Sequence, residues 1–132
     1  MPIGTKGKKM EVESAEYVKN LMLPFLEKGF TFEYTYQKGG DSSCVYIYRF
    51  HKGRSYFDVR EVSGGKEINF VVSVNGSFFF PPLNILYKQD YQAFKRKHFF
   101  RKATVNERRE LIASILVKEL AKNKPDFFGI KL

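Results

Sequence analysis

Few side chains in this sequence are suited to catalysis or metal binding, since it contains two histidines and one cysteine. His51 falls in a predicted turn and His98 in a basic segment, and neither has a second ligand at the spacing of a metal site. We therefore predict no metal site and interpret both histidines as ordinary surface residues. Cys44 begins a predicted strand, where free cysteine usually behaves as a small apolar residue rather than as a nucleophile.

A second group with catalytic potential lies on one predicted strand and consists of Asp58, Arg60 and Glu61. Asp58 and Arg60 share a face of the strand, whereas Glu61 points to the other face. Such a group is either half of an acid–base site or, more commonly, part of cross-strand charge pairing on a solvated face. The chain also lacks a glycine-rich phosphate loop, a nucleophile elbow and a metal motif. We therefore predict no catalytic residues and no cofactor.

Charge is the strongest functional signal, because much of the net charge of +9 is concentrated in one segment. Residues 87–102 carry +5, from six bases and one acid, with aromatic residues between them. Lysine and arginine bind phosphates and aromatic rings stack on bases, so this pattern suits single-stranded nucleic acid. The alternatives are a solvated helix face, or a cluster that Glu107 or Glu110 neutralises. The predicted anion-binding residues are Lys88, Lys95, Arg96, Lys97, Arg101 and Lys102.

One short stretch, residues 52–59, resembles the signature of the RNA-recognition motif, which begins with a basic residue and glycine and carries rings on a strand. Lys52, Gly53 and Tyr56 match that signature. The βαββαβ order of that family is absent, because the predicted strands here follow one another without a helix between them. We therefore assign the chain to no family.

The elements that position these side chains begin with an antiparallel meander. Residues 30–37 alternate aromatic and polar side chains, which predicts a strand with all four rings on one face. The next strand, residues 44–50, is rich in β-branched and aromatic residues, which indicates partial burial on both faces. Asn75-Gly76 is a strong hairpin signal. The remaining predicted strands are 55–62, 67–74 and a short fifth strand, 77–80.

Helical patterns flank the meander on both sides. Residues 11–28 carry an apolar stripe at helical spacing, with a kink or a new turn expected at Pro24. Residues 83–102 are roughly helical, and a capping box formed by Thr104 and Glu107 predicts a last helix over residues 105–122. The tail should dock through its apolar residues, which are Phe127, Phe128 and Ile130.

These elements predict a single α+β domain over residues 11–132, in which helices pack on one face of an antiparallel sheet of four to five strands. Residues 1–10 are expected to form a flexible basic tail. We expect a cytoplasmic protein that does not enter membranes, because the sequence shows neither a membrane span nor a signal peptide, and one cysteine excludes an internal disulfide. The sequence indicates no oligomeric state.

Three hypotheses for function follow from these patterns. The first is a non-catalytic binding module for an anionic partner such as nucleic acid. The second is a protein–protein module of the inhibitor or immunity type, which uses the uncovered sheet face with Tyr46, Tyr48 and Tyr56 as its aromatic centre. The third is an enzyme with a cleft between the sheet and the helices.

Overall fold

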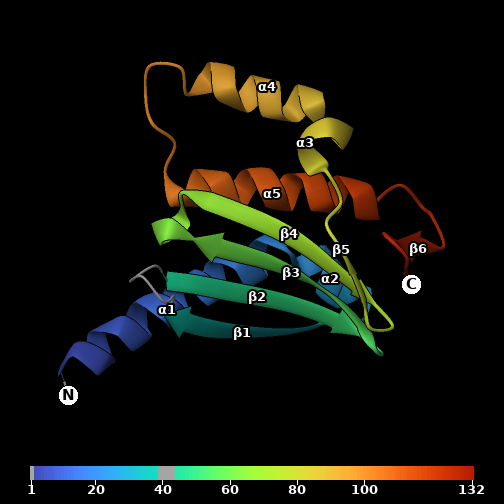
Figure 1. Cartoon of the computed structure of the whole chain (residues 1–132), viewed down its shortest axis with the longest axis horizontal. Coiled ribbons are helices and arrows are strands. Elements are labelled where there is room, and N and C mark those ends of the chain that lie inside the picture. The colour runs from blue at the N-terminus through green and yellow to red at the C-terminus, as the bar shows by residue number, and fades with distance from the viewer. Residues whose placement is uncertain (1, 39–43) are drawn as a thin grey trace.

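The chain folds around one antiparallel sheet whose strands follow in sequence order (Figure 1). The computed structural model describes residues 2–38 and 44–132, and the side chains of residues 12–37 and 45–132. The strands are β1 (Thr31–Lys38), β2 (Cys44–Lys52), β3 (Ser55–Val62), β4 (Glu67–Val74) and β5 (Ser77–Phe79). The predicted α+β class and the five-strand meander are confirmed.

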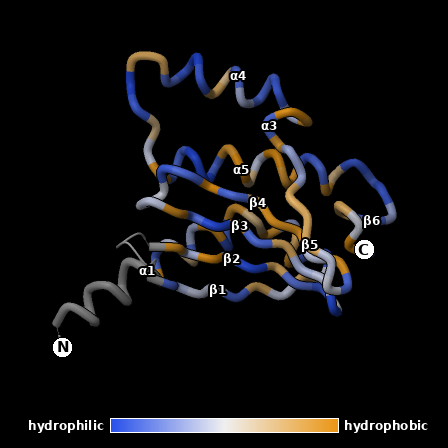
Figure 2. Tube along the Cα trace, in the orientation of Figure 1, coloured by the Kyte–Doolittle hydropathy of each residue, from blue (hydrophilic) through white to orange (hydrophobic). Residues whose placement is uncertain are grey.

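Helices cover one face of this sheet (Figure 1). The helices are α1 (Pro2–Leu21), α2 (Leu23–Glu27), α3 (Leu83–Leu86), α4 (Lys88–Lys97) and α5 (Val105–Leu120), and a 3-10 turn spans Ser63–Gly65. α1, α2 and α5 pack behind the sheet, whereas α4 lies along α5 on the side away from the sheet. Hydrophobic residues recur along α5, and α4 is mostly hydrophilic (Figure 2).

The N-terminal helix differs from its predicted bounds. α1 begins at Pro2 instead of Glu11, so residues previously assigned to a tail are helical. The flexibility of residues 1–10 stays a prediction. α1 ends at Leu21, and α2 follows with proline in its first turn, which confirms the predicted new turn at Pro24.

Phenylalanine rings dominate the core between the sheet and the helices. The rings of Phe25 and Phe57 are 5.0 Å apart, and each lies about as close to Phe127. Phe30 is 4% exposed and its ring contacts that of Phe25 in α2, so Phe30 is buried against the N-terminal helices. Phe32 packs against the core but is only partly buried. Edge-to-face and tilted contacts of this kind add to the free energy of burying the rings.

The C-terminal tail docks on the core as predicted. Phe127 and Ile130 are buried, and they pair across a small hairpin formed by β6 (Asp126–Phe127) and β7 (Ile130–Lys131). The hairpin was not predicted from the sequence.

The capping box at the start of α5 is also confirmed. The Thr104 hydroxyl accepts a bond from the Glu107 N–H at 3.1 Å, and the Glu107 carboxylate accepts one from the Thr104 N–H at 3.0 Å. None of the described helices is both long enough and apolar enough to cross a membrane.

Candidate anion-binding surface

The residues predicted to bind anions lie on α4 and on the connection that follows it. We call residues 88–102 the basic arm. Its inner side is anchored to α5 by an ion pair between Asp90 and Lys118, with 3.0 Å between Oδ2 and Nζ. Tyr91 and Phe94 turn toward α5, because they line a cavity together with Ile112 of that helix. Asp90, the one acid of the basic arm, is therefore paired with α5. The side of α4 that faces away from α5 carries basic and amide side chains.

A second anchor lies at the base of the arm. The Tyr87 hydroxyl donates to Oε1 of Glu119 on α5 at 2.6 Å. Burial raises the pKa of Glu119, but hydrogen bonds from Lys124, Tyr87 and Lys122 outweigh burial and lower that pKa to about 2. This carboxylate therefore keeps its charge, and its hold on Tyr87, over the whole physiological pH range.

All six predicted bases of the arm are exposed to solvent. Arg101 is paired, since its guanidinium donates two bonds to the Glu107 carboxylate at 3.0 and 3.3 Å. This pairing holds the pKa of Glu107 down at about 2, with help from the Thr104 N–H. The other five bases have no carboxylate within 4.0 Å among the described residues; they are Lys88, Lys95, Arg96, Lys97 and Lys102.

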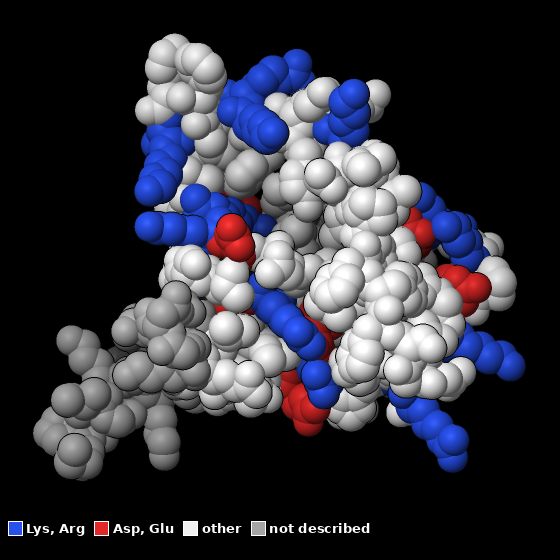
Figure 3. Space-filling view, in the orientation of Figure 1, with Lys and Arg blue, Asp and Glu red and all other residues white. Residues whose placement is uncertain are grey.

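Among the described residues, neighbouring acids therefore neutralise only one base of the arm, Arg101. Glu110, the other acid considered, accepts a bond from the Tyr17 hydroxyl at 2.7 Å. In the space-filling view, lysine and arginine side chains gather over α4 and the connection to α5 (Figure 3). Like charges at this density repel one another, so an anionic partner would relieve an existing cost.

Two aromatic residues project among these bases. Phe99 and Phe100 follow the end of α4 and are 77% and 96% exposed. Their rings meet edge to face, with centroids 4.8 Å apart. Sequence reasoning noted rings in this segment without singling out these two. Their exposure could have been inferred from the sequence, because both follow the last helical turn and lie beyond Phe94, which faces inward.

His98 corrects a prediction, because its side chain is only 6% exposed and is not an ordinary surface residue. Its ring lies 4.5 Å from that of Phe94, and its Nε2 is 3.6 Å from the Glu107 carboxylate. Neither ring nitrogen has a hydrogen-bond partner among the described residues. His51, by contrast, is half-exposed at the end of β2, 4.0 Å from the carboxylate of Glu33.

The three tyrosines predicted to form one aromatic surface do not share an exposed face. Tyr48 is completely buried beneath the helices, and its hydroxyl donates to Oε1 of Glu61 at 3.2 Å. Tyr46 lies on the same inner face, and its ring stacks 6.5 Å from that of Tyr48. Tyr56 lies on the opposite face of the sheet, because it neighbours the inward-facing Phe57. The expected aromatic centre is thus divided between the two faces.

Glu61 belongs to a buried polar network on the inner face. Arg109 of α5 donates to both of its carboxylate oxygens, at 2.5 and 2.8 Å, and also to the hydroxyl of Ser14 at 3.3 Å. Burial raises the pKa of Tyr48, and the negative charge of Glu61 raises it further. The network joins the sheet to α1 and α5, and a cavity of ≈ 250 Å³ lies beside two of its members, Ser14 and Arg109.

Asp58 lies on the open face of the sheet, yet it is fully buried by its own partners. Arg49, its neighbour in the β2–β3 register, donates at 2.7 and 3.0 Å, and Arg60 donates at 2.8 and 3.0 Å. The Arg49 guanidinium also lies 3.9 Å above the ring of Tyr56. The predicted cross-strand pairing is confirmed, and it engages both arginines of this face.

No group of three metal-binding side chains occurs within the described residues. Cys44 begins β2 as expected, but its side chain lies outside the described part of the chain.

Comparisons with known proteins add no relative. No protein-family model matches the chain, and neither the curated proteins nor the solved structures contain a match.

Proposed function

We propose that this protein is a non-catalytic module that binds single-stranded nucleic acid through the basic arm. The observation that carries the proposal is the combination of five bases without carboxylate partners and two rings, Phe99 and Phe100, that are almost fully exposed. Ammonium and guanidinium groups bind phosphates, and exposed rings provide platforms for bases that are not paired.

Single strands fit this surface better than a duplex does. The two rings meet at a steep angle, 87°, so a base can stack on one ring while its neighbour contacts the other. In a duplex the base faces are covered by neighbouring pairs, so only the phosphates would remain to be bound.

A bilayer surface is a weaker candidate for the same bases. A helix that lies in a membrane interface turns an apolar face toward the lipid. In α4 the large apolar residues, Tyr91 and Phe94, face α5 instead, and the outer side is charged. Anionic vesicles therefore serve as a competing ligand in the test.

The experiment compares two variants with the same change in net charge. The first reverses Lys95, Arg96 and Lys97 to Glu. The control reverses Lys28, Arg54 and Lys131, which are exposed and lie away from the arm. For a labelled oligothymidylate measured by fluorescence anisotropy, the arm variant should bind far more weakly, and the slope of log K against log salt should shrink by about 2, at about 0.7 per phosphate contact.

The control variant should retain most of the affinity of the wild type, because its charges lie outside the site. Replacement of Phe99 and Phe100 by Ala should weaken binding by about 1–3 kcal/mol per base that no longer stacks, with the salt slope unchanged. Equal losses in the arm variant and the control would mean that only overall charge matters. Tighter binding to anionic vesicles than to the oligonucleotide would favour a membrane surface instead.

A further inference from the structure

One edge of the sheet is left partly open. β5 pairs with β4 only from Val72 to Val74, and no other described strand pairs with the rest of this edge, residues 67–71. After β5 the chain turns away at Pro81-Pro82, because proline lacks the N–H that a ladder requires and fixes φ. This stretch without a partner strand is about 17 Å long. The chain that follows β5, residues 80–84, lies across a cavity from it.

The register shows which backbone groups point out of this edge. Val74 precedes the two-residue turn Asn75-Gly76, and the residues that flank such a turn exchange both of their backbone hydrogen bonds. Along a strand, the backbone N–H and C=O groups of successive residues point to opposite sides of the strand. Phe70 and Ile68 lie an even number of residues before Val74, so their backbone groups point to the same side as those of Val74, toward the β5 edge. Both residues therefore present an N–H and a C=O group to the open edge.

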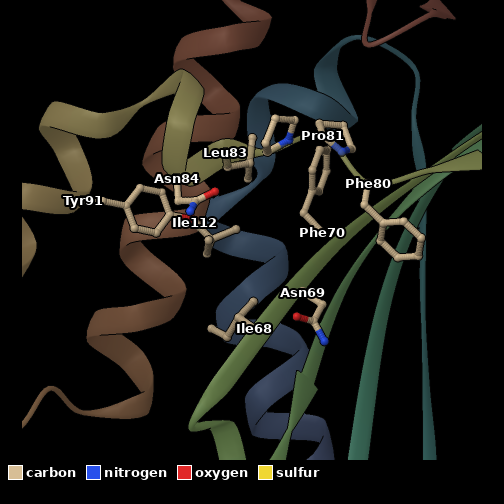
Figure 4. Close-up of a pocket in the computed structure, with 10 residues that line it drawn as sticks. Ile68, Asn69, Phe70, Phe80, Pro81, Leu83, Asn84, Tyr91 and Ile112 are labelled. Carbon is tan, nitrogen blue, oxygen red and sulfur yellow. The ribbon is translucent and has the colours of Figure 1, made fainter.

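A trough with both apolar and polar lining residues, Asn69 and Asn84 among the latter, runs beside these groups. One part has a volume of ≈ 390 Å³, with Ile68, Asn69 and Phe70 of β4 on one side and residues of α3, α4 and α5 on the other (Figure 4). A second cavity of ≈ 270 Å³ continues it toward the start of β4, and the two share Ile68, Tyr91 and Ile112 as lining residues. The trough thus follows the open edge.

The second cavity has a cationic rim. Lys66, Lys95 and Arg108 line it, and no aspartate or glutamate lines either cavity among the described residues. Arg108 is held in place by a bond from its Nη1 to the Gly65 carbonyl at 3.3 Å. An occupant is therefore favoured if it carries apolar side chains along its length and carboxylates at the end near Lys66.

We propose that this trough binds an extended acidic peptide segment of a partner protein as an added strand on β4. In this mode of recognition main-chain hydrogen bonds supply affinity, and alternate side chains supply specificity. Ile68 and Phe70 bond to the peptide backbone, and Tyr91 and Phe94 receive its apolar side chains. A nucleic acid has no regular series of N–H and C=O groups with which to extend a sheet. Lys95 belongs to both surfaces, but Phe99 and Phe100 take no part in this one, so the two proposals can be tested separately.

Amide hydrogen exchange of the full chain tests the proposal. The probe is a blocked heptapeptide in which Val and Ile alternate with Thr, with two Glu residues at one end. At saturating peptide, exchange of the Ile68 and Phe70 amides should slow by at least about ten-fold. The amides of Asn69 and Val71 bond to β3 and should keep the exchange rates they have without peptide.

Two further peptides and two variants sharpen the result. A peptide with N-methyl groups on alternate amides should give no protection, and one with Lys in place of Glu should bind about ten-fold more weakly. The Lys66→Glu/Lys95→Glu variant should reverse that charge preference. Protection that the N-methylated peptide reproduces, or no protection with any peptide, would overturn the proposal. Replacement of Phe99 and Phe100 by Ala should leave peptide binding unchanged, which separates this site from the nucleic-acid surface.

Discussion

At the scale of single residues, two carboxylates, Asp58 and Glu61, are almost completely buried. Each is enclosed by arginine, Asp58 on the open face of the sheet and Glu61 beneath the helices. Leaving either carboxylate without its arginine would cost several kcal/mol, since an unpaired buried charge is strongly destabilising. Both carboxylates are bound by arginines in the fold, so we place the proposed function on the bases of the arm that have no carboxylate partner among the described residues instead.

Tyr48 provides a pH-dependent prediction at this scale. Burial, together with the charge of Glu61, raises its pKa in the folded protein above the ordinary value near 10. A raised pKa contributes stability that is fully present below the unfolded-state pKa and is lost as pH rises toward the folded-state value. Between about pH 10 and 11, the unfolding free energy of the wild type should therefore fall more steeply than that of Tyr48→Phe, by up to ~1.4 kcal/mol per pH unit.

Urea unfolding at several alkaline pH values measures this difference. The pKa values of Tyr17, Tyr87 and Tyr91 are also raised, but they act equally in both proteins and cancel in the comparison. Parallel pH profiles for the two proteins would contradict the assigned environment of Tyr48.

Sequence reasoning could not place Tyr48 correctly, for a physical reason. Alternation along β2 shows that Tyr46 and Tyr48 share a face, but it does not show which face the helices cover. Ile47 shares its face with the polar residues Arg49 and His51 but is itself buried, as is Tyr48 on the other face, so alternation within this strand marks the open face only weakly. The choice depends on contacts with α1 and α5 that lie far away in the sequence.

At the scale of elements, local sequence patterns were sufficient to predict most strands of the sheet and the helix α5. β3 and β4 have the predicted bounds, because strict alternation between glycine-containing turns specifies them locally. The break between α3 and α4 was missed. Tyr87 leaves helical geometry there, with φ −122° and ψ 46°, and its bond to Glu119 is a tertiary contact that no local pattern reports.

The start of α5 yields a prediction about stability. Thr104→Ala removes the acceptor for the Glu107 N–H and should lower the unfolding free energy by about 1 kcal/mol. Thr104→Ser keeps a hydroxyl at the same position and should restore most of the loss. Urea denaturation followed by circular dichroism measures both variants. An alanine variant with the midpoint of the wild type would show that this cap contributes nothing to the stability of the helix.

At the scale of the whole molecule, the bases of the arm that have no carboxylate partner among the described residues are separate from the structural core. The open sheet face has its arginines bound to Asp58, and the inner face is filled by rings and by the Glu61 network. In the described part of the chain, bases without a carboxylate within 4.0 Å gather on the arm, whose helix α4 lies along α5 (Figures 1 and 3). The composition of residues 87–102 predicted that bases cluster in this segment. Only the structure shows that Arg101 is paired whereas the other five bases, among the described residues, are not, because that distinction depends on where Glu107 lies.

The most direct test of the nucleic-acid proposal is a map of the binding surface by nuclear magnetic resonance. An oligothymidylate of about ten nucleotides, within the usual site size, is titrated into the labelled full chain at ~0.1 M salt. We predict that the largest changes in amide chemical shift fall between Lys95 and Lys102. The chemical shifts of the amides around Arg49 and Arg60, on the open sheet face, should not change. Changes centred on the open face, or no changes at saturating oligonucleotide, would contradict the account.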